Sequence, residues 1–307
     1  MEVLVFGAGS LGSLVGGLLA RTHDVTLVGR DPHVAAVRES GLRVCGAVET
    51  TTHPGATTDG EGHDADLAVV TVKSFDTAAA ADTLTTGEFE AVLSLQNGLT
   101  EETLAERLPD ATVLAGTATY GADLREPGHV ACTGVGRVTL GALDGGTDPA
   151  AERAGWAFRT GGVETLIAAD MPRRRWEKLA VNAGINAVTA LARVENGALA
   201  DGPAHAVARR AARETARVAR SEGVALSNRR AVAAVERVVD ATADNRSSTR
   251  QDVEAGRQTE VEAIFGAVVA RAERASRAGH VEVEVPTVRT LADLLRAWED
   301  GAGVREE

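Results

Sequence analysis

The sequence predicts an α/β protein whose first half is a doubly wound parallel sheet and whose second half is entirely helical. Short apolar runs rich in β-branched residues alternate with helical stretches at the start of the chain, which is typical of a parallel sheet covered on both faces. A glycine-rich turn directly follows the first run. After about residue 168 the strand patterns stop, and Ala, Arg and Glu recur at helical spacing. We therefore expect two domains, over residues 1–167 and 168–307.

The strands of the first domain are predicted from its apolar runs. Four runs form the expected parallel core, at residues 2–6, 24–28, 67–71 and 91–95. Four later runs are expected to extend this sheet and close the domain, at residues 113–120, 129–133, 137–140 and 163–167. Helices fit between the early strands at residues 10–21, 32–40, 76–85 and 100–107. Residues 53–64, rich in Gly, Thr and Asp, are expected to be a surface loop.

The second domain is predicted from helical periodicity alone. We expect helices at residues 174–191, 203–222, 229–241, around 253–278, and 287–297. A glycine at position 256 weakens the prediction of the fourth helix, because glycine disfavours helix interiors.

Composition and charge limit the kinds of partner that this protein can have. Hydrophobic residues make up 44% of the 307 residues but aromatics only 3%, so the cores must be built from Ala, Val and Leu. The net charge of −12 is spread along the chain, which argues against nucleic acid or an anionic membrane surface as a partner. The chain opens directly into an apolar strand without a basic leader, and no run approaches the roughly 18 apolar residues of a membrane span. We expect a cytoplasmic protein; a homodimer is compatible with the sequence but not indicated by it.

Cysteine and histidine usage argues against a metal centre. Cys45 and Cys132 are too few and too far apart for a disulfide framework or a zinc site, and both are expected to act as small buried hydrophobes. None of the seven histidines shows HExxH or another close metal-ligand spacing. Tyr120 has Leu124 instead of Lys four residues later, so the Tyr-x-x-x-Lys arrangement of short-chain dehydrogenases is absent.

The strongest motif is the GxGxxG formed by Gly7, Gly9 and Gly12, between the first strand and the first helix. In this motif the first glycine makes a tight turn, the second lets the backbone approach a pyrophosphate, and the third lets helix and strand pack closely. Backbone N–H groups at the helix start then face the phosphates. The motif predicts a dinucleotide-binding Rossmann domain, with the cofactor held by Gly7, Ala8, Gly9, Ser10, Leu11 and Gly12. A glycine-rich turn without a ligand is the alternative.

Arg30 indicates which dinucleotide binds. It follows the second strand, where an NAD site usually has an Asp or Glu for the ribose 2′-hydroxyl. A guanidinium can pair with a 2′-phosphate and stack on adenine, which favours NADP (NADPH) over NAD. In the alternative, Arg30 begins a surface helix and Asp31 holds the ribose.

Lys73 and Asn97 follow two further strands of the predicted sheet. Because ligands of open α/β sheets lie at the carboxyl ends of the strands, both side chains are expected beside the nicotinamide. The alternative is that Lys73 is a solvated residue at the start of a helix and that Asn97 belongs to an ordinary turn.

Lys178 is the candidate proton donor. Lys73 and Lys178 are the two lysines among 32 Lys and Arg residues. An ammonium with an ordinary pKa near about 10.4 can release its proton, whereas a guanidinium stays charged. At about 100° per residue, Lys178, Asn182 and Asn186 share one face of a helix whose other residues are largely apolar. The alternative, a polar surface stripe, is disfavoured because this chain otherwise uses Arg, Glu and Asp on its surface.

Ser248 and Glu260 are weaker candidates. Glu260 could accept a hydrogen bond from a substrate hydroxyl and provide a counter-charge for Lys178, and Ser248 could donate to a carboxylate. Asp252 lies between these two residues in the sequence. If one helix carries both Asp252 and Glu260, their side chains lie within about 80° of each other around the helix axis. By spacing alone, a capping serine and a solvated glutamate are the better explanation of these residues.

Taken together, the motifs VLVFGAGSLGS, TVKSF, SLQNGL, GTATYGADLREPGHV, RRWEKLAVNAGINAVTAL and NRSSTRQDVEAGRQTEVEAI closely resemble those of the ketopantoate reductases. The resemblance spans residues 1–295 in the same order. It implies a Rossmann domain followed by a helical domain, and the NADPH-dependent reduction of ketopantoate to pantoate on the route to coenzyme A. Cys132, Thr249 and residues 279–286 depart from the family's pattern.

The resemblance also implies roles for individual residues. Lys178 would be the general acid that protonates the developing alkoxide, and Glu260 would be a second catalytic group. Asn97, Asn182, Asn186, Asn196 and Ser248 would line the substrate site. Lys73 and Asn97 would lie in the interdomain cleft beside the nicotinamide. No metal is implied.

Three alternatives remain. A Lys-x-x-x-Asn helix behind a Rossmann domain also resembles the β-hydroxyacid and 6-phosphogluconate dehydrogenases, although their glycine-rich lead-in is replaced here by Arg173-Arg174-Arg175-Trp176. A paralogue acting on another 2-keto acid would carry the same motifs. A non-catalytic NADP-binding sensor would not need Lys178.

Overall fold

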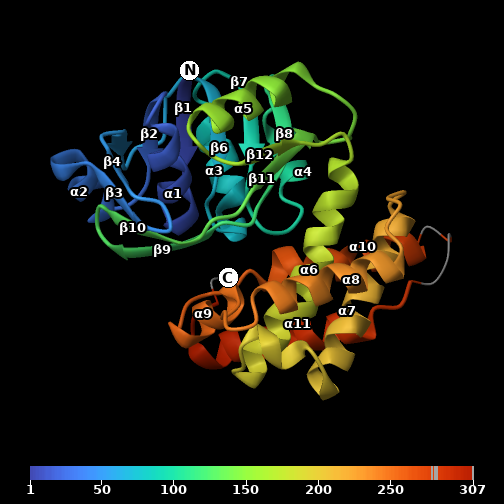
Figure 1. Ribbon diagram of the computed structural model, residues 1–307. Helices are drawn as coiled ribbons and strands as arrows, with labels where there is room; N and C mark the ends of the chain where they lie inside the picture. Colours follow the sequence, from blue (N-terminus) through green and yellow to red (C-terminus); the bar gives the residue numbers. More distant parts are fainter. Residues whose placement is uncertain (278, 280–282, 306–307) are drawn as a thin grey trace. The chain divides into compact units, whose positions relative to one another are not determined.

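The computed structural model describes residues 1–277, 279 and 283–305 and divides into two compact units (Figure 1). The first unit comprises Met1–Gln96 and Thr100–Met171, and the second comprises Asn97–Leu99 and Pro172–Glu307. The short segment Asn97–Leu99 thus belongs to the second unit although its neighbours in sequence belong to the first. The chain passes from one unit to the other three times.

An eight-stranded sheet forms the centre of the first unit (Figure 1), in the order β12-β11-β8-β7-β6-β1-β2-β5. Its strands are β1 (Glu2–Phe6), β2 (Asp24–Val28), β5 (Gly55–Thr57), β6 (Ala65–Val70), β7 (Phe89–Ser94), β8 (Thr112–Ala118), β11 (Val138–Ala142) and β12 (Thr165–Ile167). Neighbouring strands are parallel except β8 and β11. The predicted doubly wound sheet is confirmed. The predicted loop at residues 53–64 is wrong in part, because β5 lies inside it and extends the sheet.

Helices cover both faces of this sheet. They are α1 (Ser10–Leu19) and α5 (Pro149–Thr160) on one face, and α3 (Thr77–Leu84) and α4 (Glu101–Arg107) on the other. Along β1, Val3 and Val5 pack in one core with Leu14 of α1, whereas Leu4 packs in the other with Leu84 of α3. Alternate side chains of a strand point to opposite faces, so an apolar strand can serve both cores at once.

A second sheet of four strands packs on the outer side of α1. Its order is β4-β3-β10-β9, and its strands are β3 (Leu42–Gly46), β4 (Thr50–Thr52), β9 (Gly121–Glu126) and β10 (His129–Gly134). The helix α2 (His33–Ser40) leads into it. Leu42, Val44, Val130 and Cys132 point from this sheet into the core that also contains Leu14. The prediction that residues 129–133 extend the main sheet is therefore wrong, because β10 pairs with β3 and β9 instead.

The described residues of the second unit form helices joined by loops, with no strand among them (Figure 1). Its elements are α6 (Met171–Ala192), η2 (Asn196–Leu199), α7 (Gly202–Ser221), α8 (Asn228–Ala241), α9 (Ser248–Glu254), η3 (Glu262–Gly266), α10 (Ala267–Arg277) and α11 (Pro286–Ala302). Buried Ala, Val and Leu side chains from α6, α7, α8, α10 and α11 form one core. At the edge of that core the Arg271 guanidinium lies 6.0 Å from the centre of the Trp176 ring, as a cation–π contact requires.

The predicted single helix around residues 253–278 is wrong. α9 ends at Glu254, and Gly256 adopts a φ of +61°, a left-handed conformation that glycine tolerates and that stops a helix. The following helix starts with a π-helical turn over Glu262–Gly266 before it continues as α10. Asp252 and Glu260 therefore do not share one helix.

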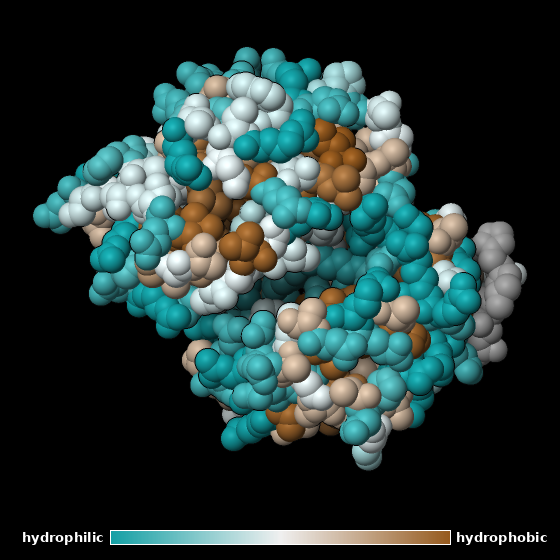
Figure 2. Space-filling model, viewed as in Figure 1, coloured by the Kyte–Doolittle hydropathy of each residue, from teal (hydrophilic) through white to brown (hydrophobic). Residues whose placement is uncertain are grey.

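The surface is mixed in character. On the visible face of the first unit, Figure 2 shows brown, hydrophobic areas among teal and white ones. The exposed large hydrophobic side chains of the first unit include Trp156 on α5 and Leu166 on β12. Within the described part of the chain, every helix is too short or too polar to cross a membrane.

Candidate functional site

The three glycines of the motif occupy three different environments at the turn between β1 and α1. Gly7 has a φ of +115°, and a Cβ there would lie 2.5 Å from the backbone nitrogen of Val72. At Gly12 a Cβ would lie 2.1 Å from the carbonyl oxygen of Gly7. At Gly9, by contrast, a Cβ would meet nothing within 4 Å. The first and third glycines are thus required by the protein's own packing, while the second borders open space that a ligand can approach.

The start of α1 suits an anion. Gly9 is its N-cap residue, so no side chain caps the helix, and its first turn holds no acidic residue. Backbone N–H groups at a helix start carry partial positive charge and bind phosphate when no cap occupies them. Together with the open space at Gly9, this arrangement fits the pyrophosphate of a dinucleotide.

Two hydroxyl groups fix the turn and the start of α1. The Thr71 hydroxyl, just after β6, donates to the carbonyl oxygen of Gly7 at 2.8 Å. The Ser10 hydroxyl accepts a hydrogen bond of 3.1 Å from the backbone N–H of Leu124 in β9. Ser10 thus links α1 to the second sheet. The role of Thr71 was not predicted, because its partner is 64 residues away.

A buried histidine, His33, is linked to the glycine turn by hydrogen bonds through Ser13. The His33 Nδ1 accepts from the Gly128 N–H at 3.0 Å, so its Nε2 carries the proton and donates to the Ser13 hydroxyl at 3.0 Å. Ser13 in turn donates to the carbonyl oxygen of Ala8 at 3.1 Å. Burial lowers the pKa of His33, in agreement with a neutral imidazole. This network could not be predicted from the sequence, because His33 and Gly128 come from segments that are distant from the turn.

Arg30 is available to a ligand at the end of β2. Its side chain is 89% exposed and its Nη2 lies 3.5 Å from the Asp76 carboxylate. The Asp31 carboxylate accepts from the Ala35 N–H at 3.1 Å and so caps the start of α2. Asp31 is therefore engaged by its own helix, whereas the Arg30 guanidinium is mostly exposed and meets Asp76 at 3.5 Å, the outer limit of a hydrogen bond.

Lys73 stands at the end of β6, half-buried, just before the short 3₁₀ helix η1 (Ser74–Asp76). The segment around it is held by Gln96, whose amide donates to the Val72 carbonyl at 3.1 Å and to the Thr77 hydroxyl at 2.8 Å. Gln96 is buried. The sequence analysis assigned no role to Gln96, although it included the SLQNGL motif that contains this residue.

In the second unit, α6 carries Lys178, Asn182 and Asn186 on successive turns. Lys178 and Asn182 are half-buried and Asn186 is buried. Asn97, from the segment between β7 and α4, meets this helix: the Asn182 Nδ2 donates to the Asn97 Oδ1 at 3.4 Å. The Asn97 Nδ2 donates to the Glu260 carboxylate at 2.7 Å. Four of the predicted residues, Lys178, Asn182, Asn97 and Glu260, are thus connected through α6 and these two hydrogen bonds.

The backbone next to Asn97 is fitted closely to the π-helical turn. Gly98 has a φ of +90°, and a Cβ there would lie 2.7 Å from the carbonyl oxygen of Ala263. Only glycine can approach so closely, so Gly98 holds the segment against η3. π-Helical turns occur frequently at functional sites, because they re-aim the neighbouring side chains. Glu260 lies two residues before this one.

Two buried amides have polar atoms without a partner among the described residues. They are the Asn186 Nδ2 and the Asn196 Oδ1. A buried polar atom without a hydrogen bond is costly, which is expected where a ligand supplies the missing group. The other end of Asn196 donates to the Thr242 hydroxyl at 2.9 Å, so η2 and the end of α8 hold it in place.

Ser248 is exposed at the first residue of α9. Its neighbour Ser247 is the N-cap, and the Ser247 hydroxyl accepts from the Arg250 N–H at 3.1 Å and from the Thr189 hydroxyl at 2.7 Å. Ser247 therefore joins α9 to α6. Of the serine pair, the capping role belongs to Ser247.

The chain matches two family descriptions in succession. Residues 3–145 match "Ketopantoate reductase PanE/ApbA", and residues 170–299 match "Ketopantoate reductase PanE/ApbA C terminal". A relative named 2-dehydropantoate 2-reductase from Halobacterium salinarum is 48% identical over 98% of this chain and its own full length. A relative of the same name from Archaeoglobus fulgidus is 38% identical over 98% of both chains.

Solved structures agree with this relationship. A PanE/ApbA family ketopantoate reductase from Ralstonia eutropha is 31% identical, with a TM-score of 0.87 over 99% of this chain and all of its own. D-mandelate dehydrogenase with NADH and anilino(oxo)acetate is 25% identical, with a TM-score of 0.89 over the same shares. From the match of both family domains and the full-length relatives, the chain belongs to the ketopantoate reductase family.

Proposed function

We propose that this protein reduces 2-dehydropantoate to pantoate with NADPH, as a step toward pantothenate and coenzyme A. The observation that carries the proposal is the 48% identity, over essentially the whole chain, to a 2-dehydropantoate 2-reductase. Two features of the structure support it. The uncapped start of α1 beside Gly9 fits a dinucleotide, and α6 carries a lysine within a set of hydrogen-bonded amides.

In the proposed domain assignment, residues 1–167 bind the cofactor and residues 168–307 bind the substrate and act on it. Gly7, Ala8, Gly9, Ser10, Leu11 and Gly12 hold the pyrophosphate, Arg30 the 2′-phosphate, and Lys73 and Asn97 the nicotinamide half. Asn97, Asn182, Asn186, Asn196 and Ser248 bind the keto acid. The open space at Gly9 and the 89% exposure of Arg30 support the first set. The orphaned amide atoms of Asn186 and Asn196 support the second.

Bound NADPH supplies the hydride that reduces the C2 ketone. Lys178 stabilises the negative charge that develops on the ketone oxygen and then donates its proton to it. Asn182 and Asn97 orient the substrate through the hydrogen bonds that join them to Glu260. Glu260, which is only 6% exposed, accepts from the Asn97 Nδ2 and so fixes the orientation of that amide, whose Oδ1 accepts from Asn182.

The test is the substitution Lys178→Arg, which keeps the positive charge but removes the transferable proton. NADPH oxidation with 2-dehydropantoate should fall by at least about 100-fold, the effect of a lost acid–base group. The dissociation constant for NADPH should change less than about twofold. The matched control is Arg229→Lys, at an exposed position of α8 outside the proposed site, which should keep normal turnover. Normal turnover in Lys178→Arg would refute the proposed role of this residue.

A second candidate is the reduction of another 2-keto acid. The similarity to D-mandelate dehydrogenase favours keeping it, since that structure matches the whole chain as well as the reductases do. A β-hydroxyacid or 6-phosphogluconate dehydrogenase activity is a more distant alternative. The assay compares kcat/KM for 2-dehydropantoate, benzoylformate and a 3-keto acid, each with NADPH and NADH. A preference for benzoylformate would replace the first proposal.

The remaining assignments concern location and assembly. We propose a cytoplasmic enzyme that has a small 2-keto acid as its partner and forms a homodimer. Size-exclusion chromatography with light scattering would test the assembly, and a mass equal to one chain would refute the dimer.

A further inference from the structure

A cysteine, a histidine and a glutamate line up on the outer face of the four-stranded sheet. The Cys45 Sγ lies 3.1 Å from the His129 Nε2, and the His129 Nδ1 lies 3.3 Å from the Glu126 carboxylate. The three side chains come from β3, β10 and β9. A nucleophile in contact with a base that is oriented by a third group is the arrangement that activates a nucleophile.

The strand register explains why these residues meet. β3 and β10 are parallel, with His129 opposite Arg43 and Ala131 opposite Cys45. Leu42 and Val44 point toward α1, so Arg43 and Cys45 point to the other face. β9 then places Glu126 opposite His129. The arrangement is therefore fixed by two strand pairings and does not depend on a loop.

Cys132 provides an internal comparison. It lies on β10, but it is 1% exposed, points into the core and donates to the Gly134 carbonyl at 3.6 Å. Burial raises the pKa of its thiol, so it stays protonated. The expectation that both cysteines are buried hydrophobes is correct for Cys132 and wrong for Cys45, which is partly exposed.

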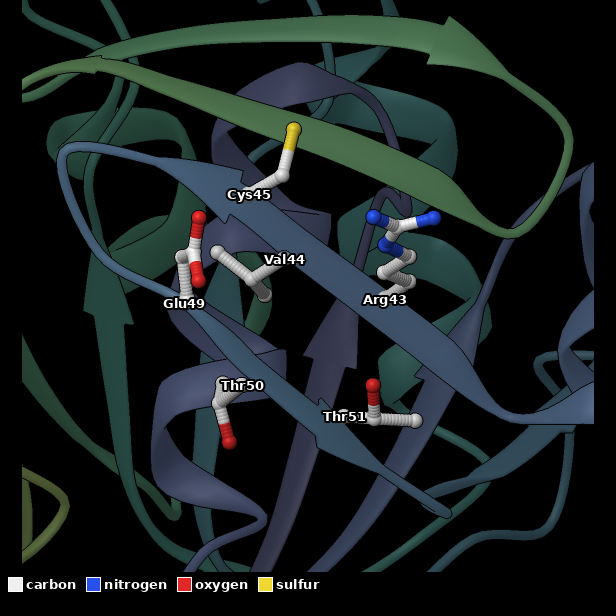
Figure 3. Close-up of a pocket in the computed structure, with 6 residues that line it drawn as sticks. All are labelled: Arg43, Val44, Cys45, Glu49, Thr50 and Thr51. Atoms are coloured by element: carbon white, nitrogen blue, oxygen red, sulfur yellow. The ribbon is translucent and has the colours of Figure 1, made fainter.

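A pocket lies beside Cys45, which is one of the residues that line it. It has a volume of about 250 Å³ and is lined by Arg43, Val44, Cys45, Glu49, Thr50 and Thr51. Figure 3 shows Arg43 and Cys45 projecting from β3, with Glu49 just before β4. A guanidinium binds a carboxylate and a carboxylate binds an ammonium, so the pocket offers both groups that an amino acid requires. It contains none of the residues assigned to the reductase.

We propose that Cys45 is an activated thiol that exchanges with small, zwitterionic, amino-acid-derived disulfides bound in this pocket. His129 takes the thiol proton at Nε2, and Glu126 stabilises the resulting imidazolium. The Cys45 thiolate attacks one sulfur of the bound disulfide R–S–S–R. A Cys45–S–S–R bond forms, the original S–S bond breaks, and the departing thiolate receives the proton from His129 and leaves as R–SH. Excess free thiol reverses the exchange.

A metal site does not account for the cluster. Among residues 1–277, 279 and 283–305, no three His, Cys, Asp or Glu side chains are arranged to hold a metal ion. The charged groups facing the thiol and its histidine are Arg43 and Glu49 at the pocket, Glu126, and the ion pair of Asp123 with Arg125 on β9. Charges of both signs surround the thiol, and the contact of His129 with Glu126 is the one that orients a base toward it.

The experiment uses the full-length protein with L-cystine as the probe, followed by mass spectrometry of the intact chain and of its peptides. We expect one half-cystine on Cys45 and none on Cys132. Cys45→Ser should abolish the adduct, and Cys132→Ser should keep it. An adduct on Cys132, or none on Cys45, would overturn the proposal. If Cys45→Ser fails to fold, as judged by circular dichroism, the peptide map of the unsubstituted protein still decides.

The activation and the specificity are tested separately. His129→Gln should slow the exchange at pH 7 by at least about tenfold, because an ordinary thiol is only a few per cent thiolate there. Arg43→Gln should slow exchange with L-cystine but not with the neutral bis(2-hydroxyethyl) disulfide. If His129→Gln exchanged as fast as the unsubstituted protein, the proposed activation by His129 would be refuted. If the unsubstituted protein exchanged equally fast with both disulfides, the proposed binding of the zwitterion in the pocket would be refuted.

Discussion

The glycine turn offers a matched pair of substitutions that separates packing from ligand binding. In Gly12→Ala the new methyl group would lie 2.1 Å from the Gly7 carbonyl oxygen and 2.5 Å from the Thr71 hydroxyl. Overpacking of this kind typically costs about 1–3 kcal/mol, because backbone has to move. In a unit of this size, each kcal/mol lowers the melting temperature by about 2–4 °C. We therefore expect Gly12→Ala to melt up to about 12 °C lower than the unsubstituted protein.

Gly9→Ala should behave in the opposite way. Its methyl group would meet nothing within 4 Å, and its φ of −81° is open to any residue. Ala is a poorer N-cap than Gly by less than about 1 kcal/mol, and it restricts the unfolded chain by about 0.4–1 kcal/mol in compensation. The melting temperature without ligand should hardly change. Binding of NADPH should weaken at least about tenfold, or 1.4 kcal/mol, because the methyl group occupies the approach to the phosphates.

Thermal unfolding without ligand and fluorescence titration with NADPH measure both variants. The reasoning would be refuted if Gly9→Ala bound NADPH as tightly as the unsubstituted protein. It would also be refuted if Gly12→Ala were as stable.

Three further predictions concern other parts of the two units. Arg30→Ser should raise KM for NADPH at least about tenfold and leave KM for NADH nearly unchanged, since a charged hydrogen bond contributes about 1.5–3 kcal/mol. Steady-state kinetics with both cofactors measures this, and an equal rise in the two KM values would contradict it. Gly98→Ala should lower the free energy of unfolding by about 1–3 kcal/mol in denaturant titrations, because its methyl group would meet the Ala263 carbonyl at 2.7 Å in a left-handed backbone conformation; an unchanged midpoint would argue against the tight fit. Burial lowers the pKa of His33 below its ordinary value of 6.5. Below about pH 6.5 the unfolded chain therefore binds a proton at this residue more readily than the folded chain does, and the free energy of unfolding should fall as the pH drops. His33→Gln should show a shallower loss of stability over that range, and an equally steep loss would assign the effect to other groups.

The parts of the structure that follow from local sequence could be predicted. The roles of Gly7, Gly9 and Gly12 are carried by spacing within six residues, so the motif indicates the turn without knowledge of the rest. The doubly wound sheet follows from apolar runs that serve two cores. Helix periodicity places α6, and with it the shared face of Lys178, Asn182 and Asn186.

The parts that depend on long-range pairing could not. β9 has the sequence GADLRE, which lacks an apolar run, and it forms only because β10 and α1 cover it. The sequence of residues 129–133 does not indicate that this strand pairs with β3 instead of joining the main sheet. The contact between Asn97 and Glu260 joins positions 163 apart and needs the break at Gly256, since a continuous helix would have aimed Glu260 elsewhere.

The membership of Asn97–Leu99 in the helical unit limits how this protein can be taken apart. A helical fragment that starts near residue 168, where the strand pattern of the sequence ends, would lack the Asn97 amide that donates to the Glu260 carboxylate. It would also lack Gly98, which packs against the Ala263 carbonyl. A chimera that grafts the helical half onto a foreign nucleotide-binding domain must therefore carry the Asn97-Gly98-Leu99 tripeptide with it. Cofactor preference cannot be exchanged by swapping whole halves unless that tripeptide stays with its own helices.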